Sequence, residues 1–232
     1  KDTIQICRTH GQHAEPITFG FFLSVYVERW GERILKVNNA KENLKGKFSG
    51  PVGCYNGLSL FIKDVEKFES TFLEKLSLKP SRISTQIVQP EPMVDFVHSI
   101  ISSFSVLANL SDDMRNLQRT EIGEVGEPFE ENQVGSSTMP QKRNPINFEN
   151  VKSAWKTFMP RIITSYSDQI SEHQRDLTNS LSQRYIPELL VIFDSSIRRI
   201  KSIMEKIVVD KNNLAKNFNM SKDKIIAEPM QI

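Results

Sequence analysis

The sequence of 232 residues carries a formal net charge of +2, with 38% hydrophobic and 25% charged residues. This length fits one large domain or two small ones, and the composition is typical of a soluble globular protein. The weak charge and the scattered basic residues argue against binding to nucleic acid or to an anionic membrane surface. No apolar run reaches the roughly 20 residues that span a bilayer. The two lone cysteines, Cys7 and Cys54, are typical of buried thiols in a reducing compartment, so we expect a cytoplasmic protein.

Long amphipathic helices are predicted for most of the chain. Apolar residues at spacings of three, four and seven predict a first helix over residues 19–43. The same pattern predicts a second helix over residues 92–120, with Pro92 in its first turn. A third helix is expected from about residue 145 to residue 170, with a kink at Pro160.

The C-terminal part of the sequence continues in the same way. A fourth helix is predicted over residues 187–209, and Asp210 and Ser221 are each placed to cap a short helix. Because alternating strand patterns are nearly absent, we predict an all-α fold, an elongated bundle of long helices. We assign residues 1–209 to this central bundle and residues 210–232 to the start of a C-terminal domain.

The breaks between these helices are longer and chemically richer than a simple bundle needs, since its connections usually have about 2–8 residues. The predicted helical stripes themselves are typical of a core or of a subunit interface. The breaks therefore hold the candidate functional residues. They are "RTHGQHAEPITFG" (residues 8–20), "GKFSGPVGCYNG" (46–57), "GEPFEENQVGSSTMPQKRNP" (126–145) and the polar cluster "SEHQRDLTNSLSQR" (171–184).

One of these breaks carries a long and specific motif. "GSSTMPQKRNP" (residues 135–145) resembles the signature loop of the fumarase/aspartase superfamily, G-S-S-x-M-P-x-K-x-N-P. Within that superfamily, "RTHGQHAEPITFG", "STQIVQP" (84–90) and "QRDLTNSLSQR" (174–184) resemble the adenylosuccinate lyase family in order and spacing. The resemblance covers essentially the whole chain. It implies that the chain is the central helical domain, with the N-terminal domain absent and the C-terminal domain barely begun.

The resemblance implies a β-elimination that releases fumarate from a succinyl nucleotide. The substrates would be adenylosuccinate, which yields AMP, and succinyl-aminoimidazole-carboxamide ribotide. A base must remove a proton next to a carboxylate, and an acid must protonate the departing nitrogen. By resemblance Ser136 is the base, helped by an anion-binding turn of backbone N–H groups and by the charge of Lys142. By the same resemblance His10 is the acid, a role that suits an imidazole, which can hold and donate a proton near neutral pH.

The same resemblance implies a set of substrate-binding residues. Arginine forks, hydroxyls and amides are the groups that phosphate and carboxylate recognition needs. Without the resemblance, these residues would be interpreted as loop residues or as a solvated helix face, and a histidine near a helix start as structural. The implied set is Thr9, Gln86, Ser137, Lys142, Arg143, Asn144, Asn150, Arg175, Ser180 and Arg184.

The family resemblance also implies partners and a missing part of the site. It implies a homotetramer whose active sites are each built from three subunits, and a second catalytic histidine in the N-terminal domain. It implies no metal and no organic cofactor, and the four histidines and two cysteines show no metal-ligand spacing.

Two departures from the family pattern keep other functions open. Gln141 stands where most adenylosuccinate lyases have His, and Cys7 stands where Gly is usual. Gln also occurs at the first position in argininosuccinate lyases. The alternatives are therefore an argininosuccinate lyase, a carboxymuconate cycloisomerase, or a non-catalytic helical assembly module.

Overall fold

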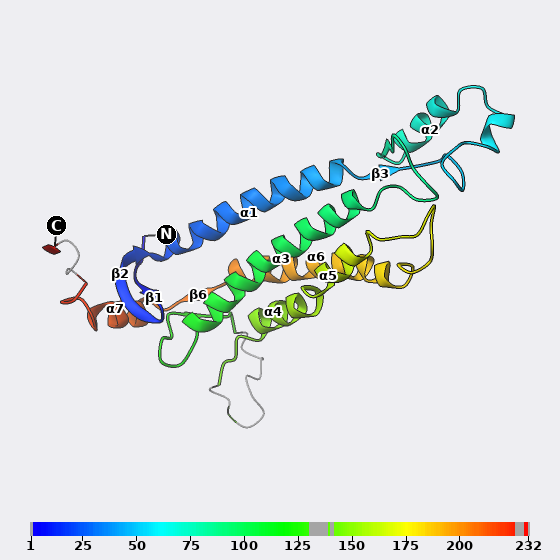
Figure 1. Cartoon of the computed structure of the whole chain (residues 1–232). Coiled ribbons are helices and arrows are strands. Elements are labelled where there is room, and N and C mark those ends of the chain that lie inside the picture. The colour runs from blue at the N-terminus through cyan, green and yellow to red at the C-terminus, as the bar shows by residue number, and fades with distance from the viewer. Residues whose placement is uncertain (1, 130–138, 140–141, 226–229, 232) are drawn as a thin grey trace. The chain divides into compact units, whose positions relative to one another are not determined.

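The computed structural model describes residues 2–129, 139, 142–225 and 230–231. The chain divides into two compact units. Figure 1 labels the helices and strands that belong to them. Unit 1 contains Lys1–Gly31, Ser105–Trp155 and Asp194–Ile232, and unit 2 contains Glu32–Phe104 and Lys156–Phe193. The predicted division of the chain at residue 210 stays a prediction.

Helices form most of the described structure. The α-helices are α1 (Phe19–Glu42), α2 (Val65–Glu74), α3 (Glu91–Leu117), α4 (Ile146–Phe158), α5 (Arg161–Ser167), α6 (Tyr185–Met204) and α7 (Lys211–Asn219), with short 3₁₀ helices η1 (Leu58–Leu60) and η2 (Ser182–Arg184). The strands are β1 (Ile4–Thr9), β2 (Gln12–Thr18), β3 (Lys45–Gly46), β4 (Lys79–Pro80), β5 (Val125–Gly126) and β6 (Val208–Val209).

The first two predicted helices agree with α1 and α3, and the later ones need corrections. The third is divided at Pro160, where α4 has ended and α5 begins one residue later. The fourth was predicted too long, because α6 ends at Met204 and the next apolar pair forms β6. Asp210 caps α7 as expected, with its carboxylate accepting from Asn213 N at 2.9 Å. Ser221 begins a run of turns instead of a helix within the described residues.

An antiparallel hairpin of β1 and β2 begins unit 1, and the sequence prediction missed it. Its two strands pair Ile4 with Thr18 and Thr9 with Gln12. His10 and Gly11 form the turn with φ angles of 54° and 77°. Two consecutive positive φ values are characteristic of the type I′ turn, whose twist matches that of a hairpin. The turn therefore presents His10 at the tip of the hairpin.

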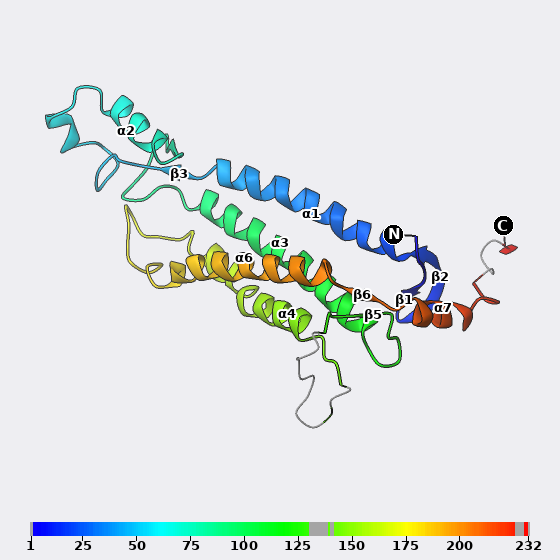
Figure 2. The same ribbon diagram turned by 180° about the vertical axis from the view of Figure 1, so that it is seen from behind.

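Three other segments surround this hairpin within unit 1. Helix α7 packs against β1. Strand β5 pairs with β6 in antiparallel register, and Figure 2 shows this pair close to the hairpin and to α7. The apolar core of the unit comes from β1, from the C-terminal half of α3, from α4 and from α7. Its most deeply buried side chains include Ile6, Leu107, Met114, Phe148, Val151 and Leu214.

Unit 2 contains the N-terminal half of α3, α2, α5 and the start of α6. Phe104 and Phe193 pack with ring centroids 5.4 Å apart in its core. The buried carboxylate of Glu69 on α2 accepts hydrogen bonds from Phe48 N and, at 2.6 Å, from Tyr55 Oη. These bonds fix residues 48–55 against α2, and a separate contact joins them to the segment 81–89. Ser49 Oγ lies 2.8 Å from Ser84 Oγ.

Two expectations from composition need correction. Helix α3 is long and apolar enough to cross a membrane by length and composition, with a mean hydropathy of 1.4 over 18 residues. However, 61% of that stretch is buried inside the protein, as in the core helix of a soluble protein. The cysteines are unpaired as expected, but neither is buried, since Cys7 is half-buried and Cys54 is exposed.

Candidate active site

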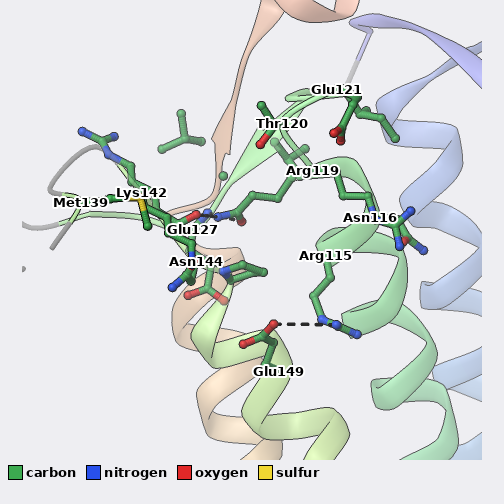
Figure 3. Close-up of a pocket in the computed structure, with 17 residues that line it drawn as sticks. Arg115, Asn116, Arg119, Thr120, Glu121, Glu127, Met139, Lys142, Asn144 and Glu149 are labelled. Atoms are coloured by element: carbon green, nitrogen blue, oxygen red, sulfur yellow. Dashed lines mark hydrogen bonds and ion pairs between the residues drawn. The ribbon is translucent and has the colours of Figure 1, made fainter. Parts of the chain in front are cut away.

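A large hollow in unit 1 lies beside the end of the signature loop. Its volume is about 1180 Å³, and its walls come from α3, residues 120–127, the loop exit and the first turns of α4. Figure 3 shows Met139 and Lys142 across the hollow from Thr120 and Glu121. The charged side chains that line it are Arg115, Arg119, Glu121, Glu127, Lys142, Arg143 and Glu149. This mixture of cations and carboxylates suits a polar, anionic ligand with hydrogen-bond donors.

Arg115 lies on the floor of this hollow and is only partly neutralised. Its Nη1 donates to Asp112 at 2.7 Å, and its Nη2 lies 3.8 Å from the Glu149 carboxylate, as the dashed line in Figure 3 marks. Lys152 also pairs with Asp112. The Nε of Arg115 is buried and has no hydrogen-bond partner. The guanidinium therefore keeps a donor that no described residue satisfies.

Glu127 and Gln118 hold the loop exit in place. The carboxylate of Glu127 accepts hydrogen bonds from the backbone N–H groups of Asn147 and Phe148, both at 2.9 Å. These N–H groups belong to the first turn of α4, where no carbonyl within the helix is available. Gln118 donates to the carbonyl oxygen of Arg143 at 3.1 Å. As a result the described end of the loop has defined partners at the residue that follows α3 and on the segment after β5.

The hairpin that carries Thr9 and His10 is anchored by another carboxylate. Glu124 is fully buried, and it accepts from Arg8 Nη2 at 2.6 Å, from Gln5 Nε2 at 2.8 Å and from Asn217 Nδ2 at 2.8 Å. It thus joins β1 to α7. Thr9 and His10 directly follow Arg8 in the chain and are exposed, and they are not among the residues that line the hollow.

His13 lies on the second strand of this hairpin in a different environment from His10. Its Nδ1 is 2.8 Å from Ser221 Oγ. Burial lowers the pKa of His13, and the positive charge of Arg8 lowers it further, while Glu124 partly opposes the shift. The surroundings therefore favour the neutral imidazole at position 13.

Four of the predicted binding residues, Gln86, Arg175, Ser180 and Arg184, lie in unit 2. Gln86 lines a cavity of about 470 Å³ with Lys47, whose Nζ donates to the Gln86 carbonyl oxygen at 3.2 Å. Burial lowers the pKa of Lys47, and Glu69 opposes this shift. Lys47 is a cation next to Gln86 that sequence reasoning missed, although "GKFSGPVG" had been singled out as an unusual break.

The polar cluster of residues 171–184 is held together by hydrogen bonds within itself. Arg175 Nε donates to the carbonyl oxygen of Asp176 at 2.8 Å. A hydrogen bond from Thr178, followed by bonds from backbone N–H groups, lowers the pKa of Asp176 to about 2. Ser180 and Arg184 are exposed. Residues 168–174 line a cavity of about 240 Å³ together with residues 83–90, so two of the predicted motifs meet in this unit.

A family model described as "Lyase" matches residues 1–157 of the chain. The chain belongs to this lyase family. Similar curated proteins include the adenylosuccinate lyase of Pyrococcus abyssi (strain GE5 / Orsay), which is 37% identical over 233 residues, 100% of this chain and 51% of that protein. The adenylosuccinate lyase of Bacillus subtilis (strain 168) is 33% identical over 94% of this chain and 50% of that protein. The chain spans about half the length of the curated relatives it matches.

Two solved structures share the fold of this lyase-family chain. The 3-carboxy-cis,cis-muconate lactonizing enzyme from Pseudomonas putida has a TM-score of 0.86 at 24% identity, over 98% of this chain and 49% of that one. A fumarate lyase from Mesorhizobium sp. BNC1 has a TM-score of 0.83 at 20% identity, over 98% of this chain and 50% of that one. These likenesses confirm the predicted all-α fold class.

The described structure brings part of the predicted site together. Lys142, Arg143 and Asn144 line the same hollow, whereas Asn150 is exposed on α4 and does not line it. Ser136 and Ser137 lie outside the described residues.

Sequence reasoning missed several residues of the hollow. Arg115, Arg119, Gln118, Glu127 and Glu149 line it, and none was predicted. The only available signal was the spacing of Arg115 and Arg119, which places two cations on one face at the end of a predicted helix.

Proposed function

We propose that the whole protein is a carbon–nitrogen lyase that cleaves adenylosuccinate to AMP and fumarate by β-elimination. The parallel cleavage of succinyl-aminoimidazole-carboxamide ribotide is part of the same proposal. The single observation that carries it is the similarity of essentially the entire chain to curated adenylosuccinate lyases, at 37% identity in the first case reported above. The motifs "RTHG" and "GSSTMPQKRNP" support it, because they supply an acid and a base for such an elimination.

The proposed roles follow from the chemistry of each side chain. Ser136 removes the proton next to the substrate carboxylate, and Ser137 donates a hydrogen bond to that carboxylate. Lys142 and Asn144 stabilise the negative charge that develops there in the transition state. His10 gives a proton to the departing nitrogen, since an imidazolium can donate at neutral pH. The exposure of His10 at the hairpin tip supports a role on a group that arrives from outside the unit.

The other predicted residues have binding roles in this proposal. Thr9 lies next to His10 and would hold the same part of the substrate, and Gln86 and Asn150 offer amide hydrogen bonds. Arg143 adds a second cation beside Lys142, and its guanidinium lies 4.6 Å from the centre of the Phe129 ring. The nucleotide part would be held by Arg175, Ser180 and Arg184, whose forks and hydroxyl suit a phosphate.

We also propose that the protein is a cytoplasmic homotetramer with shared active sites. The hollow at Lys142 is lined by residues of unit 1 that do not include His10, although both belong to that unit. A site that needs both groups is therefore easier to build from two subunits than from one. Large apolar side chains on α1 are exposed in the single chain, including Phe21 at 64%, Val27 at 72% and Leu35 at 65%. Their burial against other subunits would remove apolar surface from water.

The experiment compares two neighbouring serines in the full-length protein. We expect Ser136→Ala to lower kcat for adenylosuccinate cleavage by at least about a hundredfold, with little change in KM, because the base acts in the transition state. Ser137→Ala should mainly raise KM. A Ser136→Ala enzyme that retained a tenth of the wild-type kcat would rule out this residue as the base.

Product analysis separates the proposal from its alternatives. The wild-type protein should release fumarate from adenylosuccinate and not from argininosuccinate, and it should not lactonise carboxymuconate. Release of fumarate from argininosuccinate alone would favour the related lyase. The absence of turnover with every substrate, in a folded full-length protein with His10 and Ser136 intact, would favour the non-catalytic assembly module.

A further inference from the structure

The side-chain amide of Gln118 connects two backbone segments at the exit of the signature loop. Its Nε2 donates to the carbonyl oxygen of Arg143 at 3.1 Å, and its Oε1 accepts from the backbone N–H of Glu127 at 3.0 Å. A glutamine amide can donate through its NH₂ group and accept through its carbonyl oxygen at the same time. Gln118 immediately follows α3, so it ties the loop exit to the longest helix of the described structure.

The Arg143 carbonyl lies between two residues of the candidate site. Lys142 precedes it and Asn144 follows it, and both line the hollow. This carbonyl belongs to the peptide between Arg143 and Asn144, so its position fixes the plane from which the Asn144 side chain extends, one residue after Lys142. Lys142 N also donates to the carbonyl oxygen of Met139 at 2.9 Å, just before the peptide that Gln118 holds.

Glu127 fixes the first turn of α4, which follows the loop exit. Glu127, whose backbone N–H binds Gln118, uses its carboxylate to cap the first turn of α4 through Asn147 and Phe148. A carboxylate at a helix N-terminus is favourable both as an acceptor and through the helix dipole. Gln118 and Glu127 thus hold the chain on both sides of Asn144 and Pro145, and Pro145 itself restricts the backbone between them.

We infer that Gln118 is a positioning residue, which holds the segment Lys142–Asn144 in the geometry that the reaction needs. This inference rests on the proposed function, in which Lys142 and Asn144 stabilise the developing carboxylate charge. Small displacements of such groups reduce rates strongly, and a shift of about 1 Å can cost about a hundredfold. Gln118 is only partly buried and adds little to the apolar core, so its replacement leaves the packing of unit 1 intact.

Gln118 also lines the hollow, and it could instead contact the substrate directly. The two roles predict different backbone hydrogen exchange in the protein without substrate. A positioning residue slows hydrogen exchange of the backbone amides in residues 142–148 of the free protein. A residue that only binds substrate leaves that exchange unchanged and affects KM.

The test uses the full-length protein with Gln118→Leu, Gln118→Glu and the control Asn109→Ala. Gln118→Leu removes both hydrogen bonds, whereas Gln118→Glu keeps an acceptor for Glu127 N and loses the donor to Arg143. Asn109 also lies on α3 and accepts a hydrogen bond from Arg29 at 2.7 Å, so its replacement removes a comparable bond elsewhere in the same unit. Hydrogen exchange over residues 142–148 is measured by mass spectrometry, and kcat and KM are measured with adenylosuccinate.

We expect both Gln118 variants to exchange faster than wild type over residues 142–148, and Asn109→Ala to exchange at the wild-type rate there. We expect kcat to fall about tenfold to a hundredfold, with KM changed less than about threefold. Wild-type exchange in both Gln118 variants overturns the inference, whether or not KM rises. Should Gln118→Leu fail to fold, Gln118→Glu alone decides the question. If the wild-type protein does not cleave adenylosuccinate, the proposed function fails, while the exchange rates still show whether Gln118 holds the loop exit.

Discussion

Glu124 and Arg8 form a buried ion pair, with 2.6 Å between the carboxylate oxygen and Nη2. The Glu124 side chain is fully buried, and that of Arg8 is 15% exposed. Gln5 and Asn217 supply two more donors to the same carboxylate. The pair therefore fixes the strand whose end carries Thr9 and His10 against α7 and the segment before β5.

Glu124→Ala should be among the most destabilising substitutions in unit 1. Removing one partner of a buried pair leaves an uncompensated charge, and this typically costs about 3–5 kcal/mol. The control is Arg198→Ala, which removes an ion pair with Asp194 whose side chains are 77% and 60% exposed. That change should cost far less, because an ion pair in water is screened by solvent. Urea unfolding of both variants gives the comparison, and equal losses would contradict the anchoring role of Glu124.

His13 should make stability depend on pH on the acid side of neutrality. Burial and Arg8 lower its pKa in the folded protein below the ordinary value of 6.5. Below pH 6.5 the unfolded chain therefore binds a proton that the folded chain does not, so stability is full above this pH and falls as the pH decreases. His13→Gln should reduce the loss of stability between pH 7 and pH 5, and His98→Gln, at an exposed histidine on α3, should leave it unchanged. Denaturant unfolding midpoints are measured across this pH range. If the midpoints of wild type and His13→Gln changed equally with pH, this effect of His13 would be contradicted.

Tyr55 should have the opposite effect at alkaline pH. The hydrogen bond to Glu69, with burial and the nearby negative charge, raises the pKa of Tyr55 from 10.0 to about 12. Below pH 10 the phenol is protonated in both states, and its contribution to stability is complete. Between pH 10 and about 12 the unfolded phenol ionises first, so stability falls as the pH rises. Tyr55→Phe should lose on the order of 1–2 kcal/mol at pH 8 and show a smaller decline above pH 10. A variant whose unfolding midpoint declined as steeply as that of wild type would contradict the assignment.

Substitutions at Gly53 and Gly50 test how closely the backbone at Gly53 approaches Ser84. Both have positive φ angles, of 76° and 81°. A Cβ on Gly50 would meet nothing within 4 Å, whereas one on Gly53 would lie 2.8 Å from the Ser84 carbonyl carbon and closer still to its oxygen. Gly50→Ala should therefore cost only the strain of a left-handed residue, roughly 1–2 kcal/mol. Gly53→Ala should cost clearly more and should loosen the contact between residues 47–55 and the segment that carries Gln86. Equal unfolding midpoints for the two variants would exclude this close approach.

Regular apolar spacing explains which elements could be predicted from the sequence. The apolar stripes of α1 and α3 repeat over many turns, so both helices were predictable from this spacing alone. Val208 and Val209 continued the stripe of α6 in the sequence, yet they pair with Val125 and Gly126, a partner more than 80 residues away. The hairpin escaped prediction because its turn is His-Gly rather than Asn-Gly and because its register shifts between Ile6 and Arg8.

The candidate site could be predicted only where a motif carried it. Lys142 and Asn144 belong to a specific string, so the resemblance identified them. Gln118, Glu127 and Arg115 reach the same hollow from positions that are ordinary in a helix or a loop. Only the folded chain brings their side chains to the loop exit, and no local pattern distinguishes them from solvated residues.

Mixing experiments with two inactive variants should reveal whether active sites are shared between subunits. In the proposed tetramer, a site takes His10 from one chain and Ser136 from another. Random mixing of His10→Ala and Ser136→Ala chains in equal amounts should then restore about a quarter of the wild-type activity, since both contributing chains must carry the intact residue. If both residues act from one chain, every site lacks one of them, and the mixture stays inactive.

The control mixes wild type with the double variant His10→Ala/Ser136→Ala. This mixture should show about a quarter of the wild-type activity if sites are shared between chains, but about half if each chain forms its own complete site. Sedimentation of each mixture must show the same assembly as wild type, so that a low activity reports the arrangement of the sites and not a failure to assemble.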